Sequence, residues 1–267
     1  MIAVEARKWW QTIQISWATI MAYRVNFVFM VVGPALVFFF VKYSLWSSIY
    51  ITEPDMRIMG YNFQEMIQYQ IWTLIIGLIG QGSNSMKIAE DIRLGRISSY
   101  LIYPFGFWQF HASYFLAFQC VQLTIGLVTI VLLSALGVMG TFDLFWVIQG
   151  IFFSLAVSLV WFSMQYVIGV LAFWLEETWV LRTILVTVSQ FLSGAIIPID
   201  LYPKWVQELL AYTPFPFLTF VPAKIFMGEY QSLPHAYTVL MIWFVIIVAL
   251  GAWLFKRGLR LYTGSGM

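Results

Sequence analysis

The side chains best suited to ionic or acid–base chemistry gather in one stretch, residues 86–108, which reads MKIAEDIRLGRISSYLIYPFGFW. Between long uncharged runs it carries Lys87, Glu90, Asp91, Arg93 and Arg96. On a helix, the spacings Glu90–Arg93 and Lys87–Asp91 put opposite charges on one face. Such a charge run is usually a solvated connector between two membrane spans, and the alternative is a docking element for a partner protein in the cytosol.

Motifs for metal, nucleophilic or phosphate chemistry are absent from the sequence. There is no HExxH, CxxC or GxSxG, and the GxxxxGK[ST] loop that cradles ATP phosphates is also missing. His111 and His235 lie near predicted span ends, where a lone histidine is more often an interfacial side chain than a ligand. Cys120 is the only cysteine, so no intramolecular disulfide can form. We therefore expect this chain to bind no metal or cofactor and to carry no catalytic residue.

The composition is that of a membrane protein. Hydrophobic residues make up 61% of the 267 residues and charged residues 10%, whereas a soluble domain averages about a quarter charged residues. Aromatic residues make up 19% and include 13 Trp, which suits rings placed at membrane–water boundaries. Backbone groups in lipid must be hydrogen-bonded internally, so the long apolar runs predict helices. We expect an all-α polytopic membrane protein in contact with lipid, with no nucleic acid among its partners.

Residues 1–22 predict an amphipathic helix that lies on the membrane surface. The polar face carries Arg7, Gln11 and Gln14, and the apolar stripe consists of Trp9, Ile13, Trp17 and Ile20. A helix with tryptophan on its apolar side rests in the headgroup zone rather than crossing the bilayer. The alternative, an overlong first span, would bury the charge of Arg24 in the middle of the membrane.

Six apolar segments are long enough to cross a bilayer core of about 30 Å as helices. They cover residues 25–48, 65–86, 110–136, 144–174, 180–197 and 235–256. Lys42 is the one charge placed within a span, and its position near the outer end is explained by snorkelling towards the interface. Ion-coupled transporters usually bury carboxylates or histidines as relays, so we expect this chain to lack an energy source of its own.

The orientation follows from the positions of the basic residues. With the N-terminus in the cytosol, this layout places ten of the 14 Lys and Arg residues on the cytosolic side. The positive-inside rule therefore predicts that both termini are cytosolic. The turn between the fourth and fifth spans falls on the same side and carries Glu176 and Glu177 beside Arg182.

The segment between the last two spans, residues 198–234, is rich in proline and otherwise mostly apolar or aromatic. We refer to it as the proline-rich hairpin. Residues 203–212 predict a short helix with Asp200 near its start and proline at its first turn. Residues 217–227 predict a second short helix, which Gly228 ends. Neither can cross the bilayer, so they predict a re-entrant hairpin buried against protein, and the alternative is a small periplasmic cap.

Two stretches and the six-span layout together resemble the type-2 permease subunits of ATP-binding-cassette exporters. The similarity is to the bacterial branch of short permeases whose ATPase is a separate polypeptide. The first matching stretch is EDIRLGRISSYLIYP, with Glu90, Ile92, Arg93, Gly95, Arg96, Leu101 and Pro104. The second is LSGAIIPIDLYPKW, with Ser193, Gly194, Pro198, Pro203 and Trp205. The resemblance covers the whole chain in architecture, but matches at the level of motifs only in these two stretches.

The resemblance implies that residues 87–108 form a coupling segment, whose helix sits in a cleft of a cytosolic ATPase subunit. The implied coupling residues are Lys87, Glu90, Asp91, Arg93, Gly95, Arg96, Glu176 and Glu177. ATP and Mg would be bound by that partner, and a second permease subunit, identical or different, would complete the path in the bacterial inner membrane. The proline-rich hairpin would close the outer mouth, through Pro198, Pro203, Trp205, Pro214 and Pro216.

The substrate is expected to be amphipathic or lipid-like, such as a drug, lipid, peptide or glycan. Polar residues of the second and fifth spans are candidates for the pathway: Gln70, Thr73, Gln81, Ser83, Asn84, Thr187, Ser189 and Gln190. The alternative is that these side chains bridge one helix to another within the subunit. Three other functions compete: an ion-coupled carrier or channel, a membrane-embedded lipid enzyme using His111 or His235, and a membrane scaffold without transport.

Overall fold

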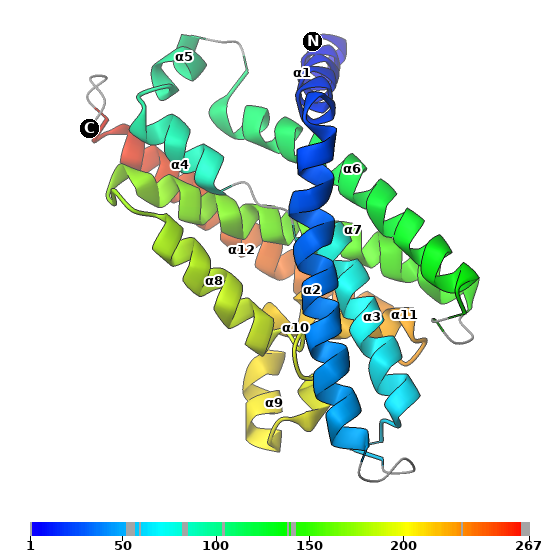
Figure 1. Ribbon diagram of the computed structural model, residues 1–267. Helices are drawn as coiled ribbons and strands as arrows, with labels where there is room; N and C mark the ends of the chain where they lie inside the picture. Colours follow the sequence, from blue (N-terminus) through cyan, green and yellow to red (C-terminus); the bar gives the residue numbers. More distant parts are fainter. Residues whose placement is uncertain are drawn as a thin grey trace.

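The computed structural model describes residues 2–51, 57–58, 60–81, 85–102, 105–137, 139, 143–230 and 232–262. Within these ranges the chain is helical and forms no β-strand beyond one isolated bridge between Ile58 and Tyr61. The prediction of an all-α protein is therefore confirmed for the described residues. Figure 1 shows α1 (Ile2–Ala22), α4 (Ser85–Arg93), α5 (Ile97–Ile102) and the end of α12 (Leu233–Leu259) in the upper part of the bundle, and α9 (Lys204–Ala211) at its lower end.

Seven long helices make up the bundle over the described residues. They are α1 (Ile2–Ala22), α2 (Arg24–Tyr50), α3 (Phe63–Gly80), α6 (Phe107–Ala135), α7 (Leu144–Val170), α8 (Trp179–Leu192) and α12 (Leu233–Leu259). By length and composition, α6, α12 and α7 with its continuation to Phe173 can each cross a membrane. Residues 36–50 of α2 and the whole of α8 are shorter apolar helices. The chain is thus a multi-pass membrane protein, and six spans remain a prediction.

The ends of two long helices differ from the sequence-based expectation. The second span was expected over 65–86, but α3 begins at Phe63 behind a capping box of Asn62 and Glu65 and ends at Gly80. The fifth was expected to reach residue 197, but α8 ends at Leu192. Gly194 follows with a φ of +80°, a left-handed conformation that glycine adopts readily and that ends a helix.

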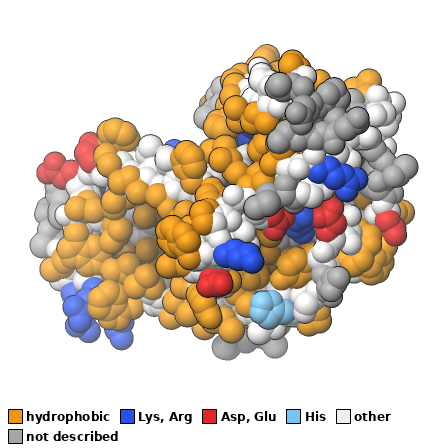
Figure 2. Space-filling model, turned by 90° about the horizontal axis from the view of Figure 1, so that it is seen from below, with side chains coloured by type: hydrophobic (Ala, Val, Ile, Leu, Met, Phe, Trp, Pro, Cys, Tyr) orange, Lys and Arg blue, Asp and Glu red, His pale blue; other side chains and the backbone are white. Residues whose placement is uncertain are grey.

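The molecule is built around α7, which packs against α12, α4, α11 (Phe220–Phe226) and α3. Glycines on α7 let two neighbours come close. A Cβ on Gly169 would lie 2.6 Å from Ile88 of α4, and one on Gly150 would lie 2.5 Å from the ring of Phe226 of α11. Seen from below in Figure 2, hydrophobic side chains cover much of the outer surface. Such a surface suits a lipid environment.

The N-terminal helix α1 packs along α6. Trp9 meets the rings of Phe105 and Trp108, and Ile20 is buried against Ala117 and Val121. Most of the predicted apolar stripe therefore has a protein partner, whereas Trp17 is partly exposed. In the described part of α1, Arg7, Gln11 and Gln14 are exposed, as expected for its polar face.

Candidate functional site

Two short helices joined by a tight turn form the described part of the coupling segment. They are α4 (Ser85–Arg93) and α5 (Ile97–Ile102). Gly95 adopts a φ of +70°, the Arg96 N–H donates to the Asp91 carbonyl at 2.9 Å, and the Gly95 N–H donates to the Ile92 carbonyl at 3.1 Å. This is the glycine-centred helix ending in which N–H groups beyond the helix bond to carbonyls of its last turn. Glycine at 95 therefore sets the direction in which the chain leaves α4.

One face of the segment is buried in the bundle. Ile88, Ala89, Ile92 and Ile97 are each at most 1% exposed. They lie in an apolar cluster with Phe173 at the end of α7, which continues as the short helix η1 (Leu171–Phe173). The Cβ that Gly169 lacks would also lie 2.9 Å from the carbonyl oxygen of Ser85. Because Gly169 has no side chain, both Ile88 and the backbone of Ser85 pack directly on α7.

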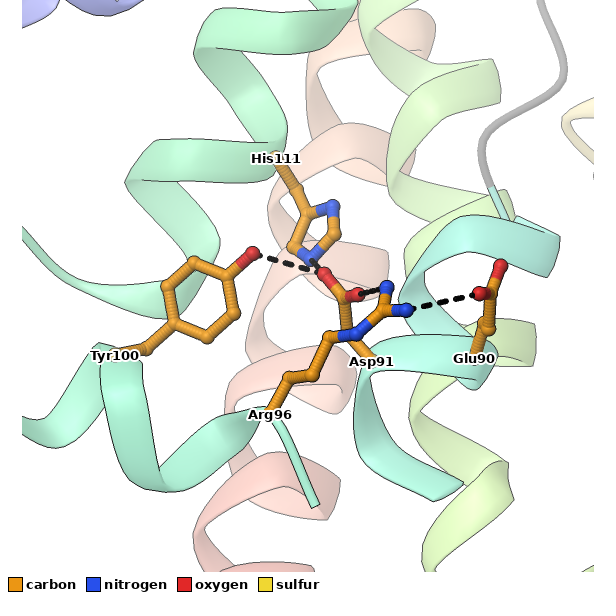
Figure 3. A network of polar contacts seen from close by, with 5 residues as sticks. All are labelled: Glu90, Asp91, Arg96, Tyr100 and His111. Atoms are coloured by element: carbon orange, nitrogen blue, oxygen red, sulfur yellow. Dashed lines mark hydrogen bonds and ion pairs between the residues drawn. The ribbon is translucent and has the colours of Figure 1, made fainter. Parts of the chain in front are cut away.

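A buried carboxylate holds the turn together (Figure 3). Asp91 accepts from Arg96 Nη1 at 2.9 Å and from the Tyr100 hydroxyl at 2.8 Å, and His111 Nε2 lies 3.4 Å from it. Burial alone would raise the pKa of Asp91, but the hydrogen bonds from His111, Tyr100 and Arg96 outweigh it and hold the pKa below its ordinary value. Asp91 is therefore an anion that joins α4, the turn, α5 and α6.

The opposite edge of the segment is open to solvent. Leu94 at the tip of the turn is 58% exposed. Glu90 is also exposed and pairs with Arg96 Nη2 at 3.3 Å. Arg93, which the spacing puts on the same face as Glu90, donates to the carbonyl of Glu176 at 2.9 Å. The result is an apolar tip flanked by charges of both signs, which is suited to contact with another protein.

The turn between α7 and α8 lies beside this edge. The Arg93–Glu176 hydrogen bond brings the two together, and Glu176 and Glu177 are both exposed. Lys87 turns the other way, and its ammonium lies 3.4 Å from the centre of the Tyr114 ring. Burial lowers the pKa of Lys87, while the nearby carboxylates of Asp91 and Glu90 oppose the shift. Lys87 therefore binds the segment to α6 rather than facing a partner.

Two residues of this site are missed by sequence reasoning. Tyr262, just past α12, donates to the Gly95 carbonyl at 2.6 Å and meets the Ser98 hydroxyl at 2.9 Å. No sequence signal links residues so far apart. His111 was expected to be interfacial, but it is fully buried against Asp91. This expectation is wrong because the aromatic rings of Tyr100, Phe107 and Phe110 enclose it.

The proline-rich hairpin forms three short helices after the turn η2 (Ile199–Leu201): α9 (Lys204–Ala211), α10 (Phe215–Leu218) and α11 (Phe220–Phe226). The expected second helix is therefore split in two, because Thr219 leaves helical geometry with φ −144°. α9 is exposed, with Trp205 at 70%, whereas α10 and α11 are mostly buried. Phe226 stacks on Trp72 with ring centres 4.3 Å apart. The second half of the hairpin thus lies inside the bundle.

The four prolines assigned to the outer gate lie at helix starts. Pro198 and Pro203 precede η2 and α9, Pro214 precedes α10, and Pro216 lies in its first turn. Asp200 does not cap α9, which has no side-chain cap. It accepts from the Tyr61 hydroxyl at 2.8 Å and pairs with Lys224 at 3.2 Å instead. The expectation that Asp200 serves the start of α9 is therefore wrong.

Polar side chains of α2 and α3 hold the chain just after α8. Lys42 Nζ donates to the Ala195 carbonyl at 2.6 Å and to Thr73 at 3.1 Å. Gln70 donates to the Ile196 carbonyl at 3.4 Å, and Gln81 donates to Thr219 at 3.4 Å. The snorkelling interpretation is wrong for Lys42, which is only 9% exposed. Free carbonyls beyond the early end of α8 account for Lys42 and Gln70, whereas Gln81 meets a hydroxyl between α10 and α11.

The remaining pathway candidates are scattered. On α8, Thr187 is exposed, Gln190 is half-buried and Ser189 is buried. Ser83 and Asn84 lie outside the described residues, as does Pro104 of the matched motif. For Gln70, Thr73 and Gln81 the contacts are those of the alternative, in which polar residues join one element to another. Among the described residues, no group of three His, Cys, Asp or Glu could hold a metal ion.

A family model described as ABC-2 family transporter protein matches residues 36–266. The match spans both the coupling segment and the proline-rich hairpin. A search of the curated proteins found no match.

Proposed function

Because the chain belongs to the ABC-2 family of transporter proteins, we propose that it is the permease subunit of an ATP-driven exporter. It supplies the path through the membrane as one half of a permease dimer, and a separate ATPase subunit binds ATP and Mg. Both termini lie in the cytosol, and the membrane is the bacterial inner membrane. The transported molecule is amphipathic or lipid-like.

The observation that carries this proposal is the construction of the coupling segment. Its apolar face is fixed on α7, its turn is held by Asp91, and its edge presents Leu94 between Glu90 and Arg96. A solvated connector needs neither a buried carboxylate nor a rigid seat on another helix. A segment that receives force needs both, because a flexible one would absorb the push.

The packing of α7 supports a route from this segment to the far side. Gly169 seats α4 on α7, and Gly150 seats α11 of the hairpin on the same helix. Closure of two ATPase subunits would press on α4, and α7 would carry the displacement to the hairpin that closes the outer mouth. Alternating between two such packings exposes the substrate first to one side and then to the other.

The test is a charge exchange on the exposed edge. The double variant Glu90→Arg/Arg93→Glu keeps the net charge, and we expect it to lose both the co-purifying ATPase and ATP-driven export. The matched control is Lys204→Glu/Glu208→Lys, which exchanges two exposed charges on α9 and should retain both. Membrane abundance and melting temperature check that each variant folds. A folded Glu90/Arg93 variant with normal export and normal ATPase recovery would overturn the docking role.

A further inference from the structure

A lysine inside the bundle carries a charge that no described residue balances. Lys42 lies on α2 and is only 9% exposed. Its ammonium donates to the Ala195 carbonyl at 2.6 Å and to the Thr73 hydroxyl at 3.1 Å, and both acceptors are neutral. Within the part of the chain that the structure describes, no Asp or Glu forms an ion pair with it. A charge held in this way within a membrane span is costly, and such charges usually serve a function.

Holding the chain that follows α8 does not by itself require a charge. Gln70 of α3 donates to the carbonyl of the next residue, Ile196, at 3.4 Å, and it does so with a neutral amide. An ammonium has three N–H donors, so the two hydrogen bonds of Lys42 leave one donor for a ligand. The positive charge and the third donor of Lys42 therefore exceed what the fold uses.

Two other buried polar atoms in this part of the bundle make no hydrogen bond. Trp46 lies one turn beyond Lys42 on the same buried face of α2, is 4% exposed, and its indole N–H has no acceptor. Gln70 is fully buried, and its amide oxygen has no donor. Thr73, which accepts from Lys42, donates in turn to the Gln70 carbonyl at 2.8 Å. Buried polar groups are nearly all hydrogen-bonded in native proteins, so these two atoms are available to a ligand.

We propose that Lys42 binds the anionic group, a carboxylate or a phosphate, of the transported molecule. This inference rests on the export function proposed above and narrows its substrates from amphipathic molecules to anionic ones. Lys42 donates a charge-assisted hydrogen bond, and the indole of Trp46 supplies a second donor. The oxygen of Gln70 accepts from a hydroxyl or N–H beside the anionic group. Because Lys42 also holds Ala195, the bound group contacts the chain between α8 and the proline-rich hairpin.

The experiment measures binding of a charged probe to the purified full-length chain in a neutral maltoside detergent at neutral pH. The probe is dansylaminoundecanoic acid, a fluorescent amphipath that ends in a carboxylate, and its primary amide is the uncharged match. Saturable binding is read from dansyl emission after subtraction of protein-free micelles. We expect the wild type to bind the acid at least about tenfold more tightly than the amide, the effect of one hydrogen bond to a charged group.

Lys42→Gln removes the charge and keeps a donor for the Ala195 carbonyl. It should bring the affinity for the acid to within about twofold of that for the amide and leave the affinity for the amide unchanged. Lys204→Gln is the matched control, since Lys204 is an exposed lysine of α9, and it should keep the preference for the acid. A merely structural role of Lys42 would lower the affinity for both probes or for neither. A preference that survives in Lys42→Gln, or a wild type that does not prefer the acid, would overturn the proposal.

A second pair of variants decides the matter if Lys42→Gln does not fold. Trp46→Phe keeps an aromatic ring on α2 and removes the indole N–H, so it should weaken binding of the acid about fivefold. Trp10→Phe is its control, because Trp10 is 61% exposed on α1, and it should leave binding of the acid unchanged. Equal effects of these two variants would contradict the proposal. No ATPase takes part in these measurements, so their failure leaves the docking test at Glu90 and Arg93 unaffected.

Discussion

The two assemblies of short helices that rest on α7 differ in how they are held. Gly169 and Gly150 are 19 residues apart, about 28 Å along the helix. At Gly169 the coupling segment contacts α7 through the Ile88 side chain and the Ser85 carbonyl, and its outer edge stays in solvent. At Gly150 the hairpin touches α7 with the ring of Phe226, which is itself buried and stacked on Trp72. One end of α7 thus carries the coupling segment, which has a solvent-exposed edge. The other end carries the buried second half of the proline-rich hairpin.

The largest expected effect comes from adding a methyl group at Gly169 or at Gly150. Gly169→Ala meets the Cβ of Ile88 and the backbone of Ser85, neither of which can rotate away. We expect Gly169→Ala to lower the free energy of unfolding by about 3 kcal/mol or more, the upper end of the range for overpacked cores. Gly150→Ala meets only side-chain ring atoms, so about 1–2 kcal/mol is expected. Unfolding in detergent measures both losses of stability, and equal losses would contradict the expected difference between the contacts at Gly169 and Gly150.

Gly77→Ala in α3 is the control for this pair. Nothing lies within 4 Å of the added Cβ, and alanine favours helix over glycine by up to about 1 kcal/mol. We therefore expect Gly77→Ala to be neutral or stabilising. A loss as large as that of Gly150→Ala would show that membrane helices here resist any added methyl group.

A smaller effect is expected from removing the charge of Asp91, which holds the turn of the coupling segment. Asp91→Asn leaves Tyr100 and His111 without an anionic partner, which should cost about 1–3 kcal/mol near neutral pH. Because the pKa of Asp91 is lowered on folding, its contribution is present above the ordinary value of 3.8. It is lost as the pH falls through the lower folded value. The stability gap between wild type and Asp91→Asn should therefore narrow below pH 3.8, and a gap that stays constant in acid would contradict it.

The smallest effect compares one tyrosine hydroxyl at each end of the molecule. Tyr262→Phe removes the bonds to Gly95 and Ser98, and Tyr61→Phe removes the bond to Asp200. Each should cost about 1 kcal/mol. In Tyr262→Phe, amide exchange should rise across residues 94–98 alone, since the turn has lost the hydrogen bonds of the Tyr262 hydroxyl. In Tyr61→Phe it should rise near Asp200. If amide exchange rises at both ends in either variant, the expectation that each hydroxyl stabilises only its own region is contradicted.

Local patterns predicted much of this structure. The long apolar runs predicted α6, α7 and α12, and the charge run located the segment at residues 86–108. Those features depend on residues close in sequence. The division of that segment into two helices by a turn at Gly95 was not predicted. The early end of α8 also has a local cause, Gly194, which hydropathy alone does not reveal.

What could not be predicted depends on partners distant in sequence. Lys42 is buried because carbonyls that follow α8 face it, and the sequence gives no hint of that meeting. The contact of His111 with Asp91 and that of Tyr262 with Gly95 need the tertiary fold in the same way. The membrane orientation and the docking role stay predictions.

The central claim is that an ATPase subunit docks on the coupling segment. Photocrosslinking from position 94, at the tip of its turn, tests this claim most directly. A benzophenone maleimide is attached to Leu94→Cys in a Cys120→Ser background, because Cys120 is exposed. Trp205→Cys on α9 is the matched site at the other end, and it is also well exposed. The account predicts that position 94, and not 205, crosslinks to a nucleotide-hydrolysing subunit in membranes active in export. An active complex with no such adduct at 94, or with an equal one at 205, would contradict it.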